Sequence, residues 1–531
     1  MKRHFFLNAA IILLAVALFC SCESKPKGAM LLPEDAQVVA CIDVEKTMEA
    51  SELGGDRQFK EKMKNGIKQM GFSRIMEKQI TDIVEDPSTT GIDFKEPFFY
   101  AVLDINRMLF AFTGSLNDSE KFESLLRTTM TEMSGDSALK TTVTDPNVKF
   151  AHIDRDAFIL FDNDGFIICN KNYDEDEAGF VEYMAKQFSE EKNYSQTKGY
   201  DMLMNENGIA KMHIACGKIL TSQNMKKKSL NTLPAETRKK IDLFYESDMI
   251  MALNVSKGEA SYVCTFDPGT DEAKKYYDKM CESAGEIKGT FLKYIDKDAL
   301  MAAAMNFDGK KYIELQDEQI NNMLGLISML NAEEIKELIK TINGDFTIGI
   351  NSKLLGNNKV PEMKIYGSTD NSMLVESIAE TNSNDMVKNG DRWIIKLTES
   401  DYTEVNGTYD WVEKEIGQAS LGYKDNASYF TISEKGNDAF KASGNAIDKS
   451  DFKGNKFYMR LNFAPMLKMK EVEEMLGSMG EGEIIRDVIK EINYAEMTVE
   501  NNYKAEIRLV MNDKDHTPIA IAIDIFKELL L

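Results

Sequence analysis

Asp35-Ala36-Gln37-Val38-Val39-Ala40 guides the interpretation of this 531-residue chain, because it returns as Asp298-Ala299-Leu300-Met301-Ala302-Ala303. Each copy has an acid, an alanine and then an apolar run, a pattern typical of a turn leading into a buried strand. Helical sequence and further strand-like runs follow both copies. Because repetition at a long period indicates related structural units, we expect two tandem related halves, residues 33–290 and 291–531.

A closer repeat lies inside the second half. Ile339-Lys340-Thr341-Ile342-Asn343 matches Ile489-Lys490-Glu491-Ile492-Asn493 in four of five positions, and both end a helical stretch before a hairpin. The smallest recurring unit is therefore strand, helix, hairpin, helix, which begins a split β-α-β arrangement of ferredoxin-like type. The sequence predicts an α+β protein in which each half has a mixed or antiparallel sheet with helices on one face.

Periodicity and turn signals place the individual elements. Strands are expected at residues 38–44, 98–102, 108–113, 211–216, 249–255, 260–266, 346–350, 363–366, 457–463, 497–499 and 505–511, with three more between 147 and 170 and a hairpin at 421–433. Helical sequence is expected up to Val84, from Ser119, from Asp174, over 235–244, over 313–342 and from Thr517.

The N-terminal stretch predicts export. Lys2 and Arg3 precede the apolar run Leu7–Phe19, which is too short to span a bilayer comfortably and fits a cleaved signal peptide. Ser21 is the small residue that a lipoprotein peptidase requires before the lipidated cysteine, so Cys22 is the predicted lipidation site. An ordinary secretory signal with incidental cysteines is the alternative.

This interpretation makes residues 1–21 a signal peptide and residues 22–32 a lipidated tether. The N-terminal acyl chains, palmitate among them, would hold the protein on a membrane without a transmembrane helix. The expected location is the outer membrane of a Gram-negative cell envelope.

The charge balance limits the expected partners. The chain has 64 basic and 87 acidic residues, a net charge of −23. Such an excess of acid disfavours nucleic acid and anionic membrane surfaces as partners. With 43% hydrophobic residues and 10 prolines, the chain is globular rather than disordered.

Five cysteines remain beyond Cys22, and their pattern favours buried thiols over a disulfide framework. They show neither close pairs nor C-x-x-C spacing, and an odd number cannot all pair internally. One bridge between neighbouring strands stays open. The five are Cys41, Cys169, Cys216, Cys264 and Cys281.

Leu32–Val44 resembles the start of a known family. A proline, acids, an alanine and a strand follow a lipobox, as in the lipoproteins of Bacteroidota that are grouped as a domain of unknown function. The resemblance spans most of the mature chain, but its motifs are structural. It implies an envelope lipoprotein and supplies no catalytic residues.

Two further expectations follow from this resemblance. Surface-exported relatives carry acids just after the lipidated cysteine, whereas Glu23–Lys27 has one acid and two lysines, which favours a periplasm-facing protein over the cell surface. Asp136-Ser137-Ala138 fits the short O-glycosylation motif of the group, so Ser137 is a possible glycan site. A chance tripeptide is the alternative.

The sequence offers no catalytic, metal or nucleotide signature. His152, His213 and His516 are far apart and are interpreted as structural residues, and no cofactor is expected. Asp162-Asn163-Asp164-Gly165 is interpreted as a hairpin turn rather than a calcium loop, because Leu160 stands where a ligand is needed. The 31 methionines are interpreted as core or interface residues.

The leading functional hypothesis is a lipid-anchored binding or scaffold protein without enzymatic activity. It follows from the duplicated body, the anchor and the missing catalytic signature, with envelope proteins or glycans as possible partners. The alternative is an envelope hydrolase whose site is assembled between the halves, signalled by convergent acids or by His213 in a deep pocket.

Overall fold

The structure is a computed structural model that describes most of the chain between residues 25 and 529. Residues 54–59, 62–63, 66, 69–72, 135–138, 143–144, 146, 155–156, 172–175, 222–232, 316–331, 357–358, 382–385, 406–407, 435–438, 449, 451 and 480–481 lie outside the described part.

Two compact units make up the chain. The first consists of Met1–Thr47, Gly55–Glu206 and Ala210–Asn231, and the second of Met48–Gly54, Asn207–Ile209 and Thr232–Leu531. This division does not follow the boundary at residue 290 that the sequence repeat suggests. The hairpin of β9 (Asp248–Ser256) and β10 (Glu259–Asp267) belongs to the second unit, because β10 pairs there with β21 (Lys504–Met511).

The first unit contains one antiparallel sheet with the strand order β8-β1-β2-β3-β7-β6-β5-β4. Its strands are β1 (Val38–Ile42), β2 (Phe98–Asp104), β3 (Leu109–Ser115), β4 (Lys140–Thr141), β5 (Lys149–Asp154), β6 (Ala157–Phe161), β7 (Gly165–Asn170) and β8 (Ala210–Ile214). Its helices are α2 (Lys27–Met30), α5 (Arg74–Glu85), α6 (Ser119–Ser134), α7 (Glu177–Lys186), α8 (Lys198–Asn205) and α9 (Cys216–Thr221), while α3 (Val44–Ser51) crosses the unit boundary.

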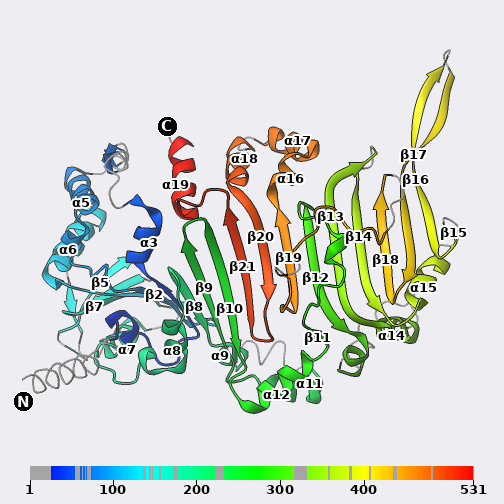
Figure 1. The fold of residues 1–531 in the computed structure, drawn as a ribbon. Helices are drawn as coiled ribbons and strands as arrows, with labels where there is room; N and C mark the ends of the chain where they lie inside the picture. The colour runs from blue at the N-terminus through cyan, green and yellow to red at the C-terminus, as the bar shows by residue number, and fades with distance from the viewer. Residues whose placement is uncertain are drawn as a thin grey trace, which may run out of the picture. The chain divides into compact units, whose positions relative to one another are not determined.

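The second unit contains a longer antiparallel sheet with the order β9-β10-β21-β20-β19-β12-β13-β14-β18-β17-β16-β15 (Figure 1). Its other strands are β11 (Ala284–Gly285), β12 (Met301–Asp308), β13 (Ile342–Leu355), β14 (Val360–Thr369), β15 (Val387–Asn389), β16 (Arg392–Val405), β17 (Thr408–Lys424), β18 (Ala427–Ser433), β19 (Phe457–Asn462) and β20 (Ile492–Val499). Its helices are α11 (Ala235–Asp242), α12 (Asp271–Met280), α14 (Ala332–Lys340), α15 (Met373–Thr381), α16 (Phe463–Leu467), α17 (Lys470–Ser478), α18 (Gly482–Glu491) and α19 (Pro518–Leu529).

The predicted α+β class is confirmed, whereas the strand pairing is not of ferredoxin-like type. In a split β-α-β unit, another strand lies between the two strands that the helix connects. Here β1 pairs directly with β2, and β12 pairs directly with β13. The helical connections therefore return the chain antiparallel to the strand it has just left.

Local sequence signals explain several elements. The Asp162 carboxylate accepts hydrogen bonds at 2.8 Å from the backbone N–H groups of Asp164 and Gly165, so this segment is the predicted hairpin turn between β6 and β7. Asp118 caps α6 by accepting from the Lys121 N–H at 3.0 Å. Phe122 of this helix then packs on Phe161 and Phe166 in the core of the first unit.

The two faces of the second sheet differ in an unusual way. The covered face, which includes Tyr458, Arg460 and Glu496, is buried although many of its side chains are polar. Beneath β12 and β14 it packs on loops that carry Phe291 and Phe452. The opposite face, called the open face below, is apolar and half-exposed. Polar groups in the covered face must find partners inside the protein.

Candidate functional site

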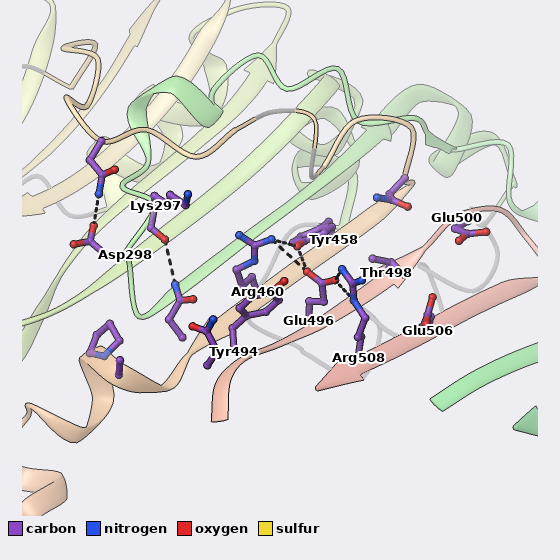
Figure 2. A pocket seen from close by; sticks show the side chains of 16 residues that line it. Lys297, Asp298, Tyr458, Arg460, Tyr494, Glu496, Thr498, Glu500, Glu506 and Arg508 are labelled. Carbon is purple, nitrogen blue, oxygen red and sulfur yellow. Dashed lines mark hydrogen bonds and ion pairs between the residues drawn. The ribbon is translucent and has the colours of Figure 1, made fainter. Parts of the chain in front are cut away.

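A pocket of about 750 Å³ opens on the covered face of the second unit, over β19, β20 and β21 (Figure 2). Its floor is made by side chains of these three strands, and its rim by the loops before β12 and β19. All its lining residues except Ala464 and Pro465 have polar side chains. They are Lys297, Asp298, Asn445, Asn455, Tyr458, Arg460, Asn462, Ala464, Pro465, Asn493, Tyr494, Glu496, Thr498, Glu500, Glu506 and Arg508.

Glu496 is the centre of the pocket floor. Register places Arg460 of β19 and Arg508 of β21 on either side of it. The Arg508 Nε donates to Glu496 Oε1 at 2.6 Å, and the second nitrogen of that guanidinium also bonds this oxygen. The Tyr458 hydroxyl donates to Oε2, and Arg460 lies 3.4 Å from the same oxygen.

The network changes the pKa values of Tyr458 and Arg508. Burial and the hydrogen bond to Glu496 raise the pKa of Tyr458 well above its usual range, so the phenol stays protonated and donates. Burial acts to lower the pKa of Arg508, but the bond to Glu496 outweighs it and the pKa is raised. The floor is therefore a hydrogen-bonded set of side chains in which two arginines share the Glu496 carboxylate.

Hydrogen bonds also hold the rim in place. The Asn462 amide donates to the Ala299 carbonyl at 2.6 Å, and the Asn445 amide donates to Asp298 at 3.2 Å. The Arg460 guanidinium lies 4.5 Å from the centre of the Tyr494 ring, a cation–π contact that orients both side chains. The pocket walls are thus positioned before any ligand enters.

The pocket has an unusually polar lining for a small-molecule site. Its volume lies within the range of small-molecule sites, but its lining is far more polar than usual. None of the sixteen lining residues is a histidine, cysteine or serine. The most buried carboxylate, Glu496, already accepts from two arginines and a tyrosine.

Comparison with known proteins identifies the family. The family profile described as a domain of unknown function (DUF4836) matches residues 29–519. The chain belongs to the DUF4836 family. The grouping with Bacteroidota lipoproteins stays a prediction.

Other comparisons add little to the DUF4836 assignment. Two solved structures, of crystal forms III and I of TP0453, are 11% and 12% identical, with TM-scores of 0.26 and 0.25. They cover 46% and 50% of this chain, and 80% and 88% of their own length. Comparison with curated proteins finds no match.

The predicted modification sites of this DUF4836 chain are not described by the structure. Cys22 and Ser137 both lie outside the described residues. In the part of the chain that is described, no helix is long and apolar enough to cross a membrane. Over the same residues, no three His, Cys, Asp or Glu side chains are grouped as metal ligands would be.

The three histidines within the described residues lie outside the pocket. His213 is buried on β8, where its Nδ1 is 3.0 Å from the Tyr194 hydroxyl, and it belongs to the first unit. His152 is paired with Glu177 at 3.1 Å and His516 with Glu52 at 2.8 Å. His152 and His213 thus lie on strands, and His516 lies just before α19.

The cysteines follow the predicted pattern in part. Cys41 and Cys169 are buried free thiols on β1 and β7, and burial raises their pKa to about 11 and about 12. Cys264 lies on β10 as expected. Cys216 begins α9 instead of ending a strand, because β8 stops at Ile214.

The sequence alone did not single out the residues of the pocket. One signal was present, since Arg460 and Arg508 each stand between apolar neighbours within predicted strands, and Glu496 stands between Ala495 and Met497 directly before a third. A charge in such a position points to the same face as its neighbours two residues away. That three such charges converge depends on the pairing of β19, β20 and β21, which the sequence does not specify.

Proposed function

We propose that this chain is a lipid-anchored envelope protein that binds a saccharide ligand in the pocket over β19–β21 and has no enzymatic activity. The observation that carries the proposal is the hydrogen-bonded network around Glu496, which gives the pocket a rigid polar floor. The anchored binding protein expected from the sequence thereby gains a specific site.

The lining favours a ligand rich in hydroxyl groups. Asn445, Asn455, Asn462 and Asn493 bring four side-chain amides, each able to donate and to accept a hydrogen bond. Acids and bases are mixed around them, so neither a strong anion nor a strong cation is favoured. Hydroxyl groups both donate and accept as well, which makes a neutral oligosaccharide the matching chemistry.

Calorimetric titration with a panel of neutral, acidic and amino-sugar oligosaccharides tests this function. Asn493 is exposed and lines the pocket, so Asn493→Ala should weaken binding without affecting the fold, by about tenfold for one lost hydrogen bond. Asn205→Ala, an exposed asparagine at the end of α8, is the matched control and should bind like the parent chain. Binding of no member of the panel, or turnover of any of them, would contradict the proposal.

The membrane anchor is tested separately. In cells fed labelled palmitate, Cys22→Ser should abolish labelling and release the protein from the membrane fraction, whereas Cys20→Ser should change neither. Retention of label in the Cys22 variant would exclude this site. Protease treatment of intact cells should leave the chain uncut if it faces the periplasm.

We further propose that the two related halves arose by duplication, with eight-stranded sheets in place of ferredoxin-like units. The order β8-β1-β2-β3-β7-β6-β5-β4 recurs as β19-β12-β13-β14-β18-β17-β16-β15 when the strands are numbered within each half. A search profile built from residues 291–531 of family members should detect residues 33–290. Failure to do so in a deep family alignment would weaken the duplication.

A further inference from the structure

The open face of the second sheet is apolar across eight neighbouring strands, from β9 to β14. The pairing registers place these side chains on one face, in rows that run across the sheet. One such row consists of Leu253, Tyr262, Ile507, Met497, Met459, Ala303, Ile348 and Ile365.

No charged residue occupies this face at the paired positions of the eight described strands. The rows beside the first one contain Met251, Cys264, Ala505, Val499, Phe457, Met305, Phe346 and Gly367 on one side, and Val255, Ala260, Leu509, Ala495, Leu461, Met301, Ile350 and Met363 on the other. These three rows, called the strip below, are therefore uncharged although the chain has a net charge of −23.

The strip is accessible. Ile507 is 49% exposed and Tyr262 is 38% exposed, and the other side chains of the central row are half-exposed. On the opposite face of the same strands, Tyr458 and Thr347 are buried. The sheet therefore has its buried core on one face, with Ala302, Ala304 and Tyr366, and an exposed apolar surface on the other.

The size of the strip matches that of a stable protein interface. Eight strands about 4.8 Å apart, with three residues of one face each, cover roughly 700–800 Å². Standard interfaces bury about 800 Å² per partner, and apolar patches of this size on a soluble protein mark interaction sites.

We propose that the open face is the interface of a homodimer, in which two copies pack these sheets face to face. A sheet with one apolar face is stable when a second apolar layer covers it, and two such sheets pack about 10 Å apart as a sandwich. A two-fold axis would set each copy's strip against the other's.

The charge pattern favours a second copy over a lipid surface. Because the strip is uncharged, two copies can meet there without opposing like charges. A membrane surface would be favoured by lysines or arginines within the strip, and these eight strands place none there. Methionines at positions 251, 301, 305, 363, 459 and 497 can adapt to identical side chains across the axis.

Sedimentation of the chain beginning at Glu23, which contains every described residue, tests the proposal over a concentration series. We expect a reversible monomer–dimer equilibrium. Ile507→Glu places a carboxylate in the strip and should raise the dissociation constant about 100-fold or more. Ile75→Glu is the matched control, since Ile75 is 59% exposed in the first turn of α5 and lies outside the strip; it should dimerise normally.

Thiol labelling gives a second readout that does not depend on the variant. Cys264 lies on the open face, and its reaction with a maleimide, followed by peptide mass spectrometry, should slow as the parent chain dimerises but not in Ile507→Glu. A parent chain that stays monomeric at all concentrations overturns the proposal. Protection of Cys264 from the maleimide at every protein concentration also overturns it, because the chain would then cover the strip itself. Protection of Cys264 by lipid vesicles but not by a higher protein concentration overturns it as well, because the strip would then bind lipid.

Discussion

At Glu496, one carboxylate is bonded by two arginines and a tyrosine within the covered face of a sheet. Burying these charges is unfavourable unless they are paired and hydrogen-bonded. The pairing is specific to the three strands that supply it, since Tyr458 and Arg460 come from β19 and Arg508 from β21. The hydrogen bonds of Glu496 therefore form only when β19, β20 and β21 pair in the correct register.

Glu496→Gln should destabilise the second unit by about 3 kcal/mol, because it removes the buried carboxylate that Tyr458, Arg460 and Arg508 contact. Denaturant unfolding at neutral pH measures the change in the free energy of unfolding. Glu506→Gln, in the same pocket but less buried, is the control and should change it by less than about 0.5 kcal/mol. Equal free energies of unfolding for the two variants would show that the charge of Glu496 does not stabilise the network.

Asp345 ties a loop to β13 and makes stability depend on pH. Its carboxylate accepts from the Lys288 N–H at 2.9 Å, from the N–H and hydroxyl of Thr290 at 2.8 Å, and from the Asn306 amide at 2.9 Å. Burial acts to raise the pKa of this carboxyl, but the hydrogen bonds outweigh it and the pKa lies below the ordinary 3.8.

A lowered pKa in the folded state means that this stabilisation is complete above pH 3.8 and is lost as the pH falls below it. Asp345→Asn should lower stability at pH 7 by about 2 kcal/mol and flatten the acid limb of the stability curve. Unfolding free energies from pH 2 to pH 7 check this. Asp391→Asn, an exposed residue of the same unit, should preserve the acid limb; an unchanged limb in Asp345→Asn would be inconsistent with this account.

Among the elements, α8 lies close against β8 because Gly199 has no side chain. A Cβ on Gly199 would lie 2.1 Å from Cε1 of His213 and 2.6 Å from both ring nitrogens. The buried imidazole is also in contact with Tyr194, so it cannot move aside freely. His213 is therefore part of the packing between a helix and a strand.

Gly199→Ala should lower the free energy of unfolding by about 2–3 kcal/mol through overpacking. Thermal and denaturant unfolding of the first unit measure it. Gly477→Ala is the opposite case, since Gly477 lies in the last turn of α17 with open space around its Cβ position, and it should gain up to about 0.5 kcal/mol. A stable Gly199 variant would mean that α8 can shift away from the sheet.

Sequence patterns predicted many elements but not their pairing. The hairpin of β9 and β10 was predictable from apolar runs flanking Lys257-Gly258, because turn and period agree. The long hairpin of β16 and β17 was missed, since the sequence of residues 398–415 is rich in acids and hydroxyl residues and does not alternate regularly between apolar and polar. The pocket was missed because its floor depends on strand register, which places Arg460 of β19 beside Glu496 of β20.

At the scale of the whole molecule, the last strand completes the second sheet. β21 lies between β20 and β10, so residues near 262 pair with residues near 507. Such non-local pairing requires closure of a long loop before any contact is gained, which slows folding. The hairpin of β9 and β10 can form locally, but one edge of β10 stays unpaired until the C-terminal strand arrives.

Pulse-labelling hydrogen exchange during refolding should resolve this order within a single strand. Neighbouring amides of an antiparallel strand point to opposite sides, and the Phe266 N–H donates to Tyr503 at 2.8 Å, towards the β21 side. The amides of Cys264 and Phe266 should therefore be protected late, together with those of β21. The amides of Val263 and Thr265, which face β9, serve as the internal control and should be protected earlier. Simultaneous protection of both sets would mean that β9, β10 and β21 form in one step, so that docking of the C-terminal strand nucleates this sheet instead of completing it.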